Sequence, residues 1–239
     1  MRSYTRHQLK QDAFTTSTAE TISWAVENRS TLIAAGTVGV VILALLVGGW
    51  AFIQYRDQQA RQQLAAAIQQ FNNPIRPAGM PASPDQPSFA SSEERGKTTN
   101  PEFVRIADKY SHTQSAAVAS YFAGITYRDM NDTPAAEKSL EEVAGSHYAE
   151  IASLAKLALA SVYHDAGKNS QAVDLYKQLI DHPTVSVGKS TAQFGLASLY
   201  QSMSKPDEAR HLYEQMAKES PGTMVAQMAS QRLAELGKP

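Results

Sequence analysis

The feature that most constrains this chain is an uninterrupted apolar stretch near its start. Residues 31–53 read TLIAAGTVGVVILALLVGGWAFI and contain no charged side chain. An α-helix rises about 1.5 Å per residue, so roughly 20 apolar residues cross the hydrocarbon core of a bilayer. A helix buried in a globular core is seldom apolar on every face over such a length. The stretch therefore predicts a single transmembrane helix.

A cleavable signal peptide is the main alternative for an apolar segment near an N-terminus. Signal peptides have apolar regions of about 7–15 residues, followed by a cleavage site of small residues. Here the apolar stretch is longer, and the sequence GGWAFIQYR at its end has bulky residues where small ones are required. The sequence thus predicts a retained anchor that contacts the lipid bilayer through residues 31–53.

The distribution of basic residues predicts the orientation of this anchor. More of them precede the apolar stretch than follow it before residue 72: Arg2, Arg6, Lys10 and Arg29, against Arg56 and Arg61. Basic residues concentrate on the cytoplasmic side of membrane proteins. We therefore expect residues 1–30 to form a cytoplasmic tail and the chain after residue 53 to lie on the other side of the membrane.

Two segments of different composition follow the anchor. Residues 54–71 contain strong helix formers, with Ala60, Leu64, Ala67 and Phe71 on one stripe, which predicts a helical extension of the anchor. Residues 72–100 contain five prolines and few large apolar side chains, so they cannot build a packed core. They predict a proline-rich disordered loop, which serves either as a linker or as a ligand for another domain.

A repeat in the C-terminal part decides the fold. The segments AGITYRDMNDTPAAEKSLEEV, LASVYHDAGKNSQAVDLYKQL and LASLYQSMSKPDEARHLYEQM align with offsets of 36 and 37 residues. Each copy keeps a small residue, a tyrosine, an alanine and a large residue at the same spacing. In that order the matched residues are Gly124, Ala160 and Ala197; Tyr127, Tyr163 and Tyr200; Ala136, Ala172 and Ala209; and Leu140, Tyr176 and Tyr213.

This pattern resembles the tetratricopeptide repeat family, whose unit of about 34 residues is a pair of antiparallel helices with small residues where they cross. One pair cannot bury its apolar face, so about three or more must stack. Together with the apolar stretch, the resemblance implies an all-α chain: a single transmembrane helix followed by an α-solenoid of about three to four repeats plus a capping helix. The repeat domain is expected over residues 101–239, although the early tryptophan of the family is missing.

The order of the parts resembles the YfgM-type ancillary subunits of the SecYEG translocon. Those are bacterial inner-membrane proteins with a short charged tail, one span and a periplasmic tetratricopeptide repeat domain. The resemblance implies a single-pass protein of the bacterial inner membrane, with a cytoplasmic N-terminus and a periplasmic repeat domain. The implied partners are translocon subunits, periplasmic chaperones or exported client chains. The long proline-rich insert departs from the usual spacing of that family.

Resemblance to tetratricopeptide domains also implies a partner-binding groove along the first helix of each repeat. The groove positions transfer to Val118, Tyr121, Ile125, Arg128 and Asp129 in the first copy. They transfer to Leu154, Leu157, Ser161, His164 and Asp165 in the second, and to Thr191, Phe194, Ser198, Gln201 and Ser202 in the third. Such a mixed surface with an apolar floor suits hydrophobic stretches of partner chains. Alternatively, its large apolar residues simply pack inside the solenoid.

The sequence contains no pattern that indicates catalysis, cofactor binding or nucleic-acid binding. The chain has no cysteine, its six histidines show no metal-ligand spacing, and it has no glycine-rich phosphate loop. Residues 101–239 contain 13 Lys and Arg against 16 Asp and Glu, which is not the basic surface that nucleic acid requires. Two non-enzymatic functions remain: an adaptor at the site of protein export, or an envelope scaffold for outer-membrane assembly or cell division.

Overall fold

The computed structural model describes residues 24, 26, 28–81 and 87–237. Most of the expected cytoplasmic tail (residues 1–23) and the centre of the proline-rich segment (residues 82–86) lie outside the described residues. The chain divides into two compact units, Met1–Gln54 and Tyr55–Pro239. The division falls directly after the apolar stretch.

The described part of the first unit is mainly the N-terminal portion of helix α2 (Arg29–Phe71). Its apolar side chains face outward, and Leu46 and Trp50 each expose 65% of their surface. The most apolar 18-residue window has a mean hydropathy of 2.5, and none of it is buried. Among the residues that the structure describes, α2 is the one helix that is long and apolar enough to cross a membrane.

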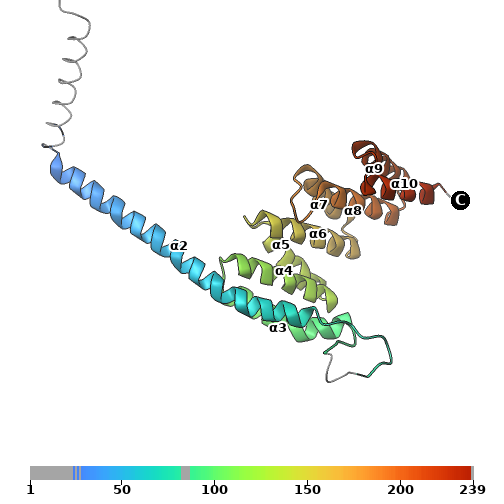
Figure 1. The fold of residues 1–239 in the computed structure, drawn as a ribbon, viewed down its shortest axis with the longest axis horizontal. Helices are drawn as coiled ribbons and strands as arrows, with labels where there is room; N and C mark the ends of the chain where they lie inside the picture. The colour runs from blue at the N-terminus through green and yellow to red at the C-terminus, as the bar shows by residue number, and fades with distance from the viewer. Residues whose placement is uncertain (1–23, 25, 27, 82–86, 238–239) are drawn as a thin grey trace, which may run out of the picture. The chain divides into compact units, whose positions relative to one another are not determined.

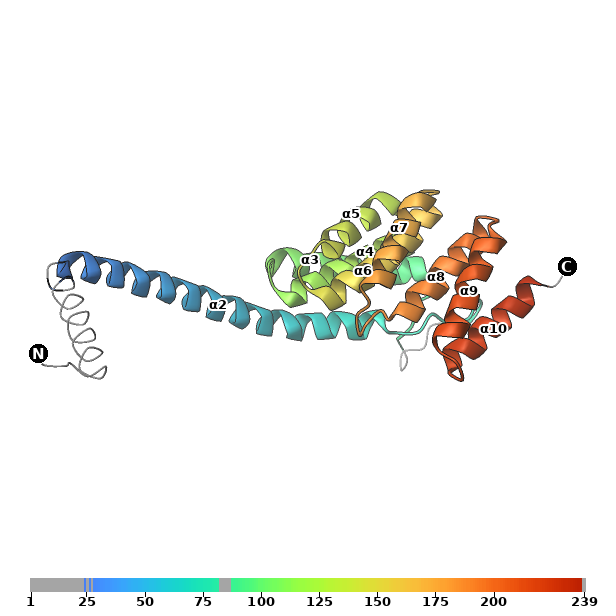
Figure 2. The ribbon, with the colours of Figure 1, turned by 90° about the horizontal axis from the view of Figure 1, so that it is seen from above.

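The second unit is all-α. After the C-terminal portion of α2 come α3 (Ser92–Lys109), α4 (Gln114–Asp129), α5 (Thr133–Ala144), α6 (Ala149–Asp165), α7 (Asn169–Asp181), α8 (Lys189–Ser202), α9 (Pro206–Glu219) and α10 (Met224–Leu236). From α3 to α10, each helix packs beside the next (Figure 1), and the same order is visible from above (Figure 2).

The helices pair as the repeat predicts: α4 with α5, α6 with α7, and α8 with α9, and α10 packs on α9. The alanines shared by the three copies, Ala136, Ala172 and Ala209, are fully buried, and so is Leu140. The portion of α2 from Tyr55 forms an earlier pair with α3, because its Leu64 joins the cluster built around Phe103. The predicted solenoid with a capping helix is therefore confirmed.

A left-handed residue ends the first helix of each of the three repeats. Asn131, Gly167 and Ser204 have φ angles of 60°, 74° and 59°. In each turn the next amide donates to the carbonyl of the repeat tyrosine, at 2.9 Å for Tyr127, 2.7 Å for Tyr163 and 2.8 Å for Tyr200. These bonds satisfy carbonyls that a helix end leaves without a partner. The chain therefore reverses at the same register in every copy.

The expected loop boundary at residue 100 must be corrected, because α3 begins at Ser92. The Ser91 side chain accepts a hydrogen bond of 3.1 Å from the Glu94 amide. The Glu94 carboxylate in turn accepts from the amide of Ala90, the residue before this cap, so two side chains satisfy backbone amides at the start of α3. Upstream, Phe89 is buried and forms a parallel bridge with Ile75. The end of the proline-rich segment is therefore an ordered part of the repeat domain.

Candidate partner-binding face

The first helices of the three repeats, α4, α6 and α8, carry the expected groove positions. Six of these residues are exposed: Arg128, Asp165, Thr191, Ser198, Gln201 and Ser202. All six are charged or carry a hydroxyl or amide group. The accessible part of the face is therefore polar.

The structure brings five of the expected residues together around one cavity of about 270 Å³ between α6 and α8. We call it the α6/α8 pocket. Its lining residues are Ser161, His164, Asp165, Tyr176, Gly195, Ser198, Leu199 and Ser202. Groove positions of the second and third repeats thus converge on a single site, which their separation in the sequence does not reveal.

The electrostatics of the α6/α8 pocket exclude one kind of ligand recognition. Asp165 lines the pocket, and no lysine or arginine is among its lining residues. The ring nitrogen Nδ1 of His164 lies 2.8 Å from the side-chain oxygen of Asn169, so this imidazole is oriented by its own repeat. Burial raises the pKa of Tyr176, although the Ser161 hydroxyl opposes this, so the phenol is neutral near pH 7. The pocket has no cation with which to grip a carboxylate.

The expected apolar floor is largely used for packing. Tyr121, Ile125 and Leu157 are half-buried against the cluster of buried residues that extends from α5 to α8. Val118 packs on the cluster around Phe103, and Leu154 packs on the cluster around Val187.

Phe194 is engaged in the same way. It packs on the C-terminal cluster, where the centre of its ring lies 5.9 Å from that of Tyr213. The structure thus favours the packing interpretation for these apolar positions.

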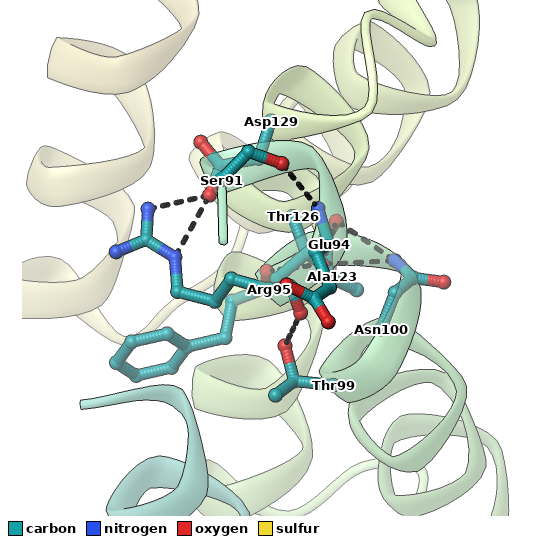
Figure 3. Close-up of polar contacts among 9 residues, drawn as sticks. Ser91, Glu94, Arg95, Thr99, Asn100, Ala123, Thr126 and Asp129 are labelled. Carbon is teal, nitrogen blue, oxygen red and sulfur yellow. Dashed lines mark hydrogen bonds and ion pairs between the residues drawn. The ribbon is translucent and has the colours of Figure 1, made fainter. Parts of the chain in front are cut away.

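Asp129 is also engaged elsewhere. Its Oδ2 accepts hydrogen bonds from Nε and Nη2 of Arg95 on α3, at 3.2 and 2.6 Å, and the Asp129 side chain is only 8% exposed (Figure 3). Asn100 completes this junction by donating to the Ala123 carbonyl and the Thr126 hydroxyl, at 3.2 and 2.9 Å. Asp129 therefore holds α3 against α4, and we leave it out of the proposed face.

Three lining residues, Tyr176, Gly195 and Leu199, were not predicted from the sequence as parts of a site. A Cβ atom built on Gly195 would lie 2.3 Å from Cε1 of Tyr176, so the ring occupies the space that only glycine leaves. Tyr176 was visible in the sequence as a repeat position that is leucine in the first copy. A glycine in the helix after it is the signal that could have identified the contact.

Among the described residues, no cluster of three histidine, aspartate or glutamate side chains could hold a metal ion. What the face offers chemically is therefore hydrogen bonding by hydroxyl, amide and carboxylate groups. Each hydroxyl and amide can both donate and accept.

Comparison with known proteins agrees with this architecture. A putative kinesin light chain from Podosopora anserina with nearly identical TPR-like repeats is 16% identical, with a TM-score of 0.56, over 75% of this chain and 86% of that one. A variant of that protein with one residue replaced by methionine is also 16% identical, with a TM-score of 0.57, over 75% and 85%. At this identity the likeness concerns the fold alone. No curated protein matches the chain significantly.

Family comparison is more direct. A tetratricopeptide repeat family matches residues 191–223, which correspond to most of α8 and all of α9. The tetratricopeptide repeat-like domain family matches residues 23–181, which is more than half of the chain. Neither matched family is a catalytic one, and such repeats indicate protein–protein interaction. The chain belongs to the tetratricopeptide repeat-like domain family.

Proposed function

We propose that this protein is a membrane-anchored adaptor that binds extended segments of partner proteins on the face formed by α6 and α8. The observation that carries this proposal is the α6/α8 pocket, because it joins hydroxyl and carboxylate groups from two successive repeats. Ser161 and Ser198 face it from neighbouring helices, so a segment lying across both repeats would meet polar groups along its length.

The chemistry of this face suits the main chain of a partner more than any one side chain. Ser198 and Gln201 are exposed and can donate to carbonyls of an extended segment. The exposed Ser202 hydroxyl, which donates its proton to the Leu199 carbonyl, can accept from an amide of that segment. Main-chain groups are common to all sequences, so recognition of this kind tolerates different partners. An adaptor for many client chains needs that tolerance.

Helix α2 supports the retained anchor. The apolar stretch and the first helix of the repeat domain are parts of one helix, Arg29–Phe71. Cleavage after the apolar stretch would cut just before Asp57 and Ala60, which are buried in the repeat domain. The excess of basic residues before the anchor supports a cytoplasmic N-terminus.

Within this class we propose an ancillary subunit of the protein-export translocon in the bacterial inner membrane. Its repeat domain would lie in the periplasm and contact translocon subunits, periplasmic chaperones or exported chains. The layout of tail, span and repeat domain supports this role through its resemblance to YfgM-type subunits. The alternative is an envelope scaffold for outer-membrane assembly or cell division.

A binding measurement tests the proposal. The full chain in detergent micelles is titrated with fluorescent α-lactalbumin that has been reduced and carboxymethylated, so that it stays unfolded. We expect binding, and we expect Ser198→Arg to weaken it at least fivefold, because a long side chain fills the α6/α8 pocket. Ser170→Arg makes the same change at an exposed position outside that pocket and serves as the control.

Equal affinity of both variants for the unfolded probe would show that the α6/α8 pocket is not part of the binding surface. If the unfolded probe does not bind and a single folded envelope protein is recovered in a fixed ratio, the scaffold replaces the adaptor.

A further inference from the structure

A second cavity lies between helices α7 and α9, and its residues differ from those of the α6/α8 pocket. Its volume is about 560 Å³. Ile180, Leu196 and Leu212 give it an apolar interior, and Lys177 and Tyr200 stand at its polar border. We call it the α7/α9 slot.

One repeat earlier, the corresponding position between α5 and α7 is crossed by polar contacts. The Tyr163 hydroxyl donates to Oε1 of Glu141 at 2.5 Å. Next to it, Nζ of Lys168 lies 2.5 Å from Oε2 of Glu137. Burial and the Glu141 carboxylate raise the pKa of Tyr163 to about 12, which agrees with a strongly held phenol proton. Two carboxylates of α5 thus accept hydrogen bonds from Tyr163 and Lys168.

The register of the repeat shows what changes in the next copy. Tyr163 and Lys168 correspond to Tyr200 and Lys205, so both donors are kept. The two carboxylates are lost, because Glu137 corresponds to Val173 and Glu141 to Lys177.

These substitutions leave donors without acceptors at the slot. Within the described part of the chain, no hydrogen bond or ion pair joins the side chains of Lys177, Tyr200 or Lys205 to other groups. Lys177 also stands where the preceding repeat has the acidic residue Glu141.

We infer that the α7/α9 slot binds a segment of a partner protein in which an acidic residue stands next to a large apolar residue. The carboxylate takes the place that Glu141 holds one repeat earlier, where it accepts from the Tyr200 hydroxyl and pairs with Lys177. The apolar side chain enters between Ile180 and Leu212, which are half-buried.

Acidic residues of the slot limit the partner to one carboxylate. Asp207 and Glu208, in the first turn of α9, also line the slot, and Asp207 is paired with Arg210 at 2.7 Å. A second acidic group there would meet like charge, which is unfavourable. The slot therefore distinguishes a segment with a single acidic residue beside its apolar side chain from a uniformly acidic one.

Selection from a random peptide library tests this inference. Dodecapeptides displayed on phage are selected on the full chain in detergent micelles. We expect enrichment of sequences with Asp or Glu directly beside Leu, Ile, Phe or Met. The best sequence is then made as an acetylated, amidated and fluorescent peptide, and its affinity is measured by anisotropy.

Three variants make the result specific. Lys177→Glu restores the acid of the preceding repeat and should weaken peptide binding at least tenfold. Lys138→Glu makes the same change in charge at an exposed position on α5 and should leave affinity unchanged. Ser198→Arg also should have no effect, so failure of the α6/α8 face and failure of the slot give different results. Enrichment without an acidic residue, no enriched peptide, or equal affinity for Lys177→Glu would overturn the inference.

Discussion

The carboxylate of Asp57 accepts a hydrogen bond of 2.9 Å from the backbone amide of Ser115. Asp57 follows the apolar stretch by only a few residues, and Ser115 lies in the first turn of α4. The first amides of a helix have no partner within the helix, so this carboxylate caps α4 from another element. The Thr113 side chain accepts from the Ala116 amide at 3.1 Å and completes the cap. The first helix pair is thereby joined to the second.

Removal of this cap should destabilise the repeat domain. Asp57→Ala leaves the buried Ser115 amide unsatisfied and should lower the free energy of unfolding by about 2 kcal/mol. Asp57→Asn keeps an acceptor oxygen and should cost less. Chemical unfolding of the full chain in detergent, followed by circular dichroism, measures both. Asp108→Ala, at an exposed position of α3, should have almost no effect.

The same contact predicts a dependence on pH. Burial raises the pKa of Asp57. Hydrogen bonds from the Ser115 amide and hydroxyl and the charge of Arg61 together lower it by more, so the pKa lies below its ordinary value. The unfolded carboxyl titrates near pH ~3.9. The stabilisation is therefore complete above that pH and is lost as the pH falls towards the lower folded pKa. Melting temperatures at pH 7 and pH 3 should differ less for Asp57→Asn than for the natural chain; an equal difference would contradict this.

Gly195 should not tolerate even a methyl group. Gly195→Ala places its Cβ against the Tyr176 ring and should destabilise the domain by about 1–3 kcal/mol through overpacking. Gly145→Ala is the control, because its Cβ meets no atom closer than 3.7 Å. Adding Tyr176→Leu to Gly195→Ala should recover part of the loss in thermal unfolding. A stable Gly195→Ala variant would show that the two helices are farther apart.

The Arg95–Asp129 pair should couple α3 to α4. The Arg95 guanidinium also lies 4.4 Å from the centre of the Phe71 ring, so Arg95→Lys loses planar contacts as well as hydrogen bonds. Arg95→Ala should cost about 2 kcal/mol of unfolding free energy. In a double-mutant cycle with Asp129→Ala, we expect the two costs to be far from additive. Additive costs would mean that the pair contributes nothing as a pair.

Periodic features of the fold were predictable from the sequence. The columns around Ala136 and Leu140 predict the stacked helix pairs, and the composition of residues 31–53 predicts the long apolar helix that α2 contains. The start of α3 was missed because prolines dominated the segment. The local signal was Ser91 three residues before Glu94, the sequence pattern of a helix N-terminus, and it extends over a single turn.

The site was less predictable for a physical reason. A repeat register identifies which positions share a face but not how much of each side chain the neighbouring helices cover. Phe194 and Ser198 both fit the groove pattern, yet the first packs on the core and only the second is exposed. Asp129 fits the pattern too, and its partner Arg95 lies in a segment where no helix was expected. Coverage of this kind depends on contacts between elements distant in the sequence.

The adaptor function is tested most directly by photo-crosslinking in intact membranes. A photoreactive residue is placed at Ser198, in the α6/α8 pocket, and in a separate variant at Ser170, outside that pocket. We expect adducts from position 198, and few from position 170, with translocon subunits, envelope chaperones or chains in transit. Adducts with cytoplasmic proteins alone, or equal adducts from both positions, would contradict it.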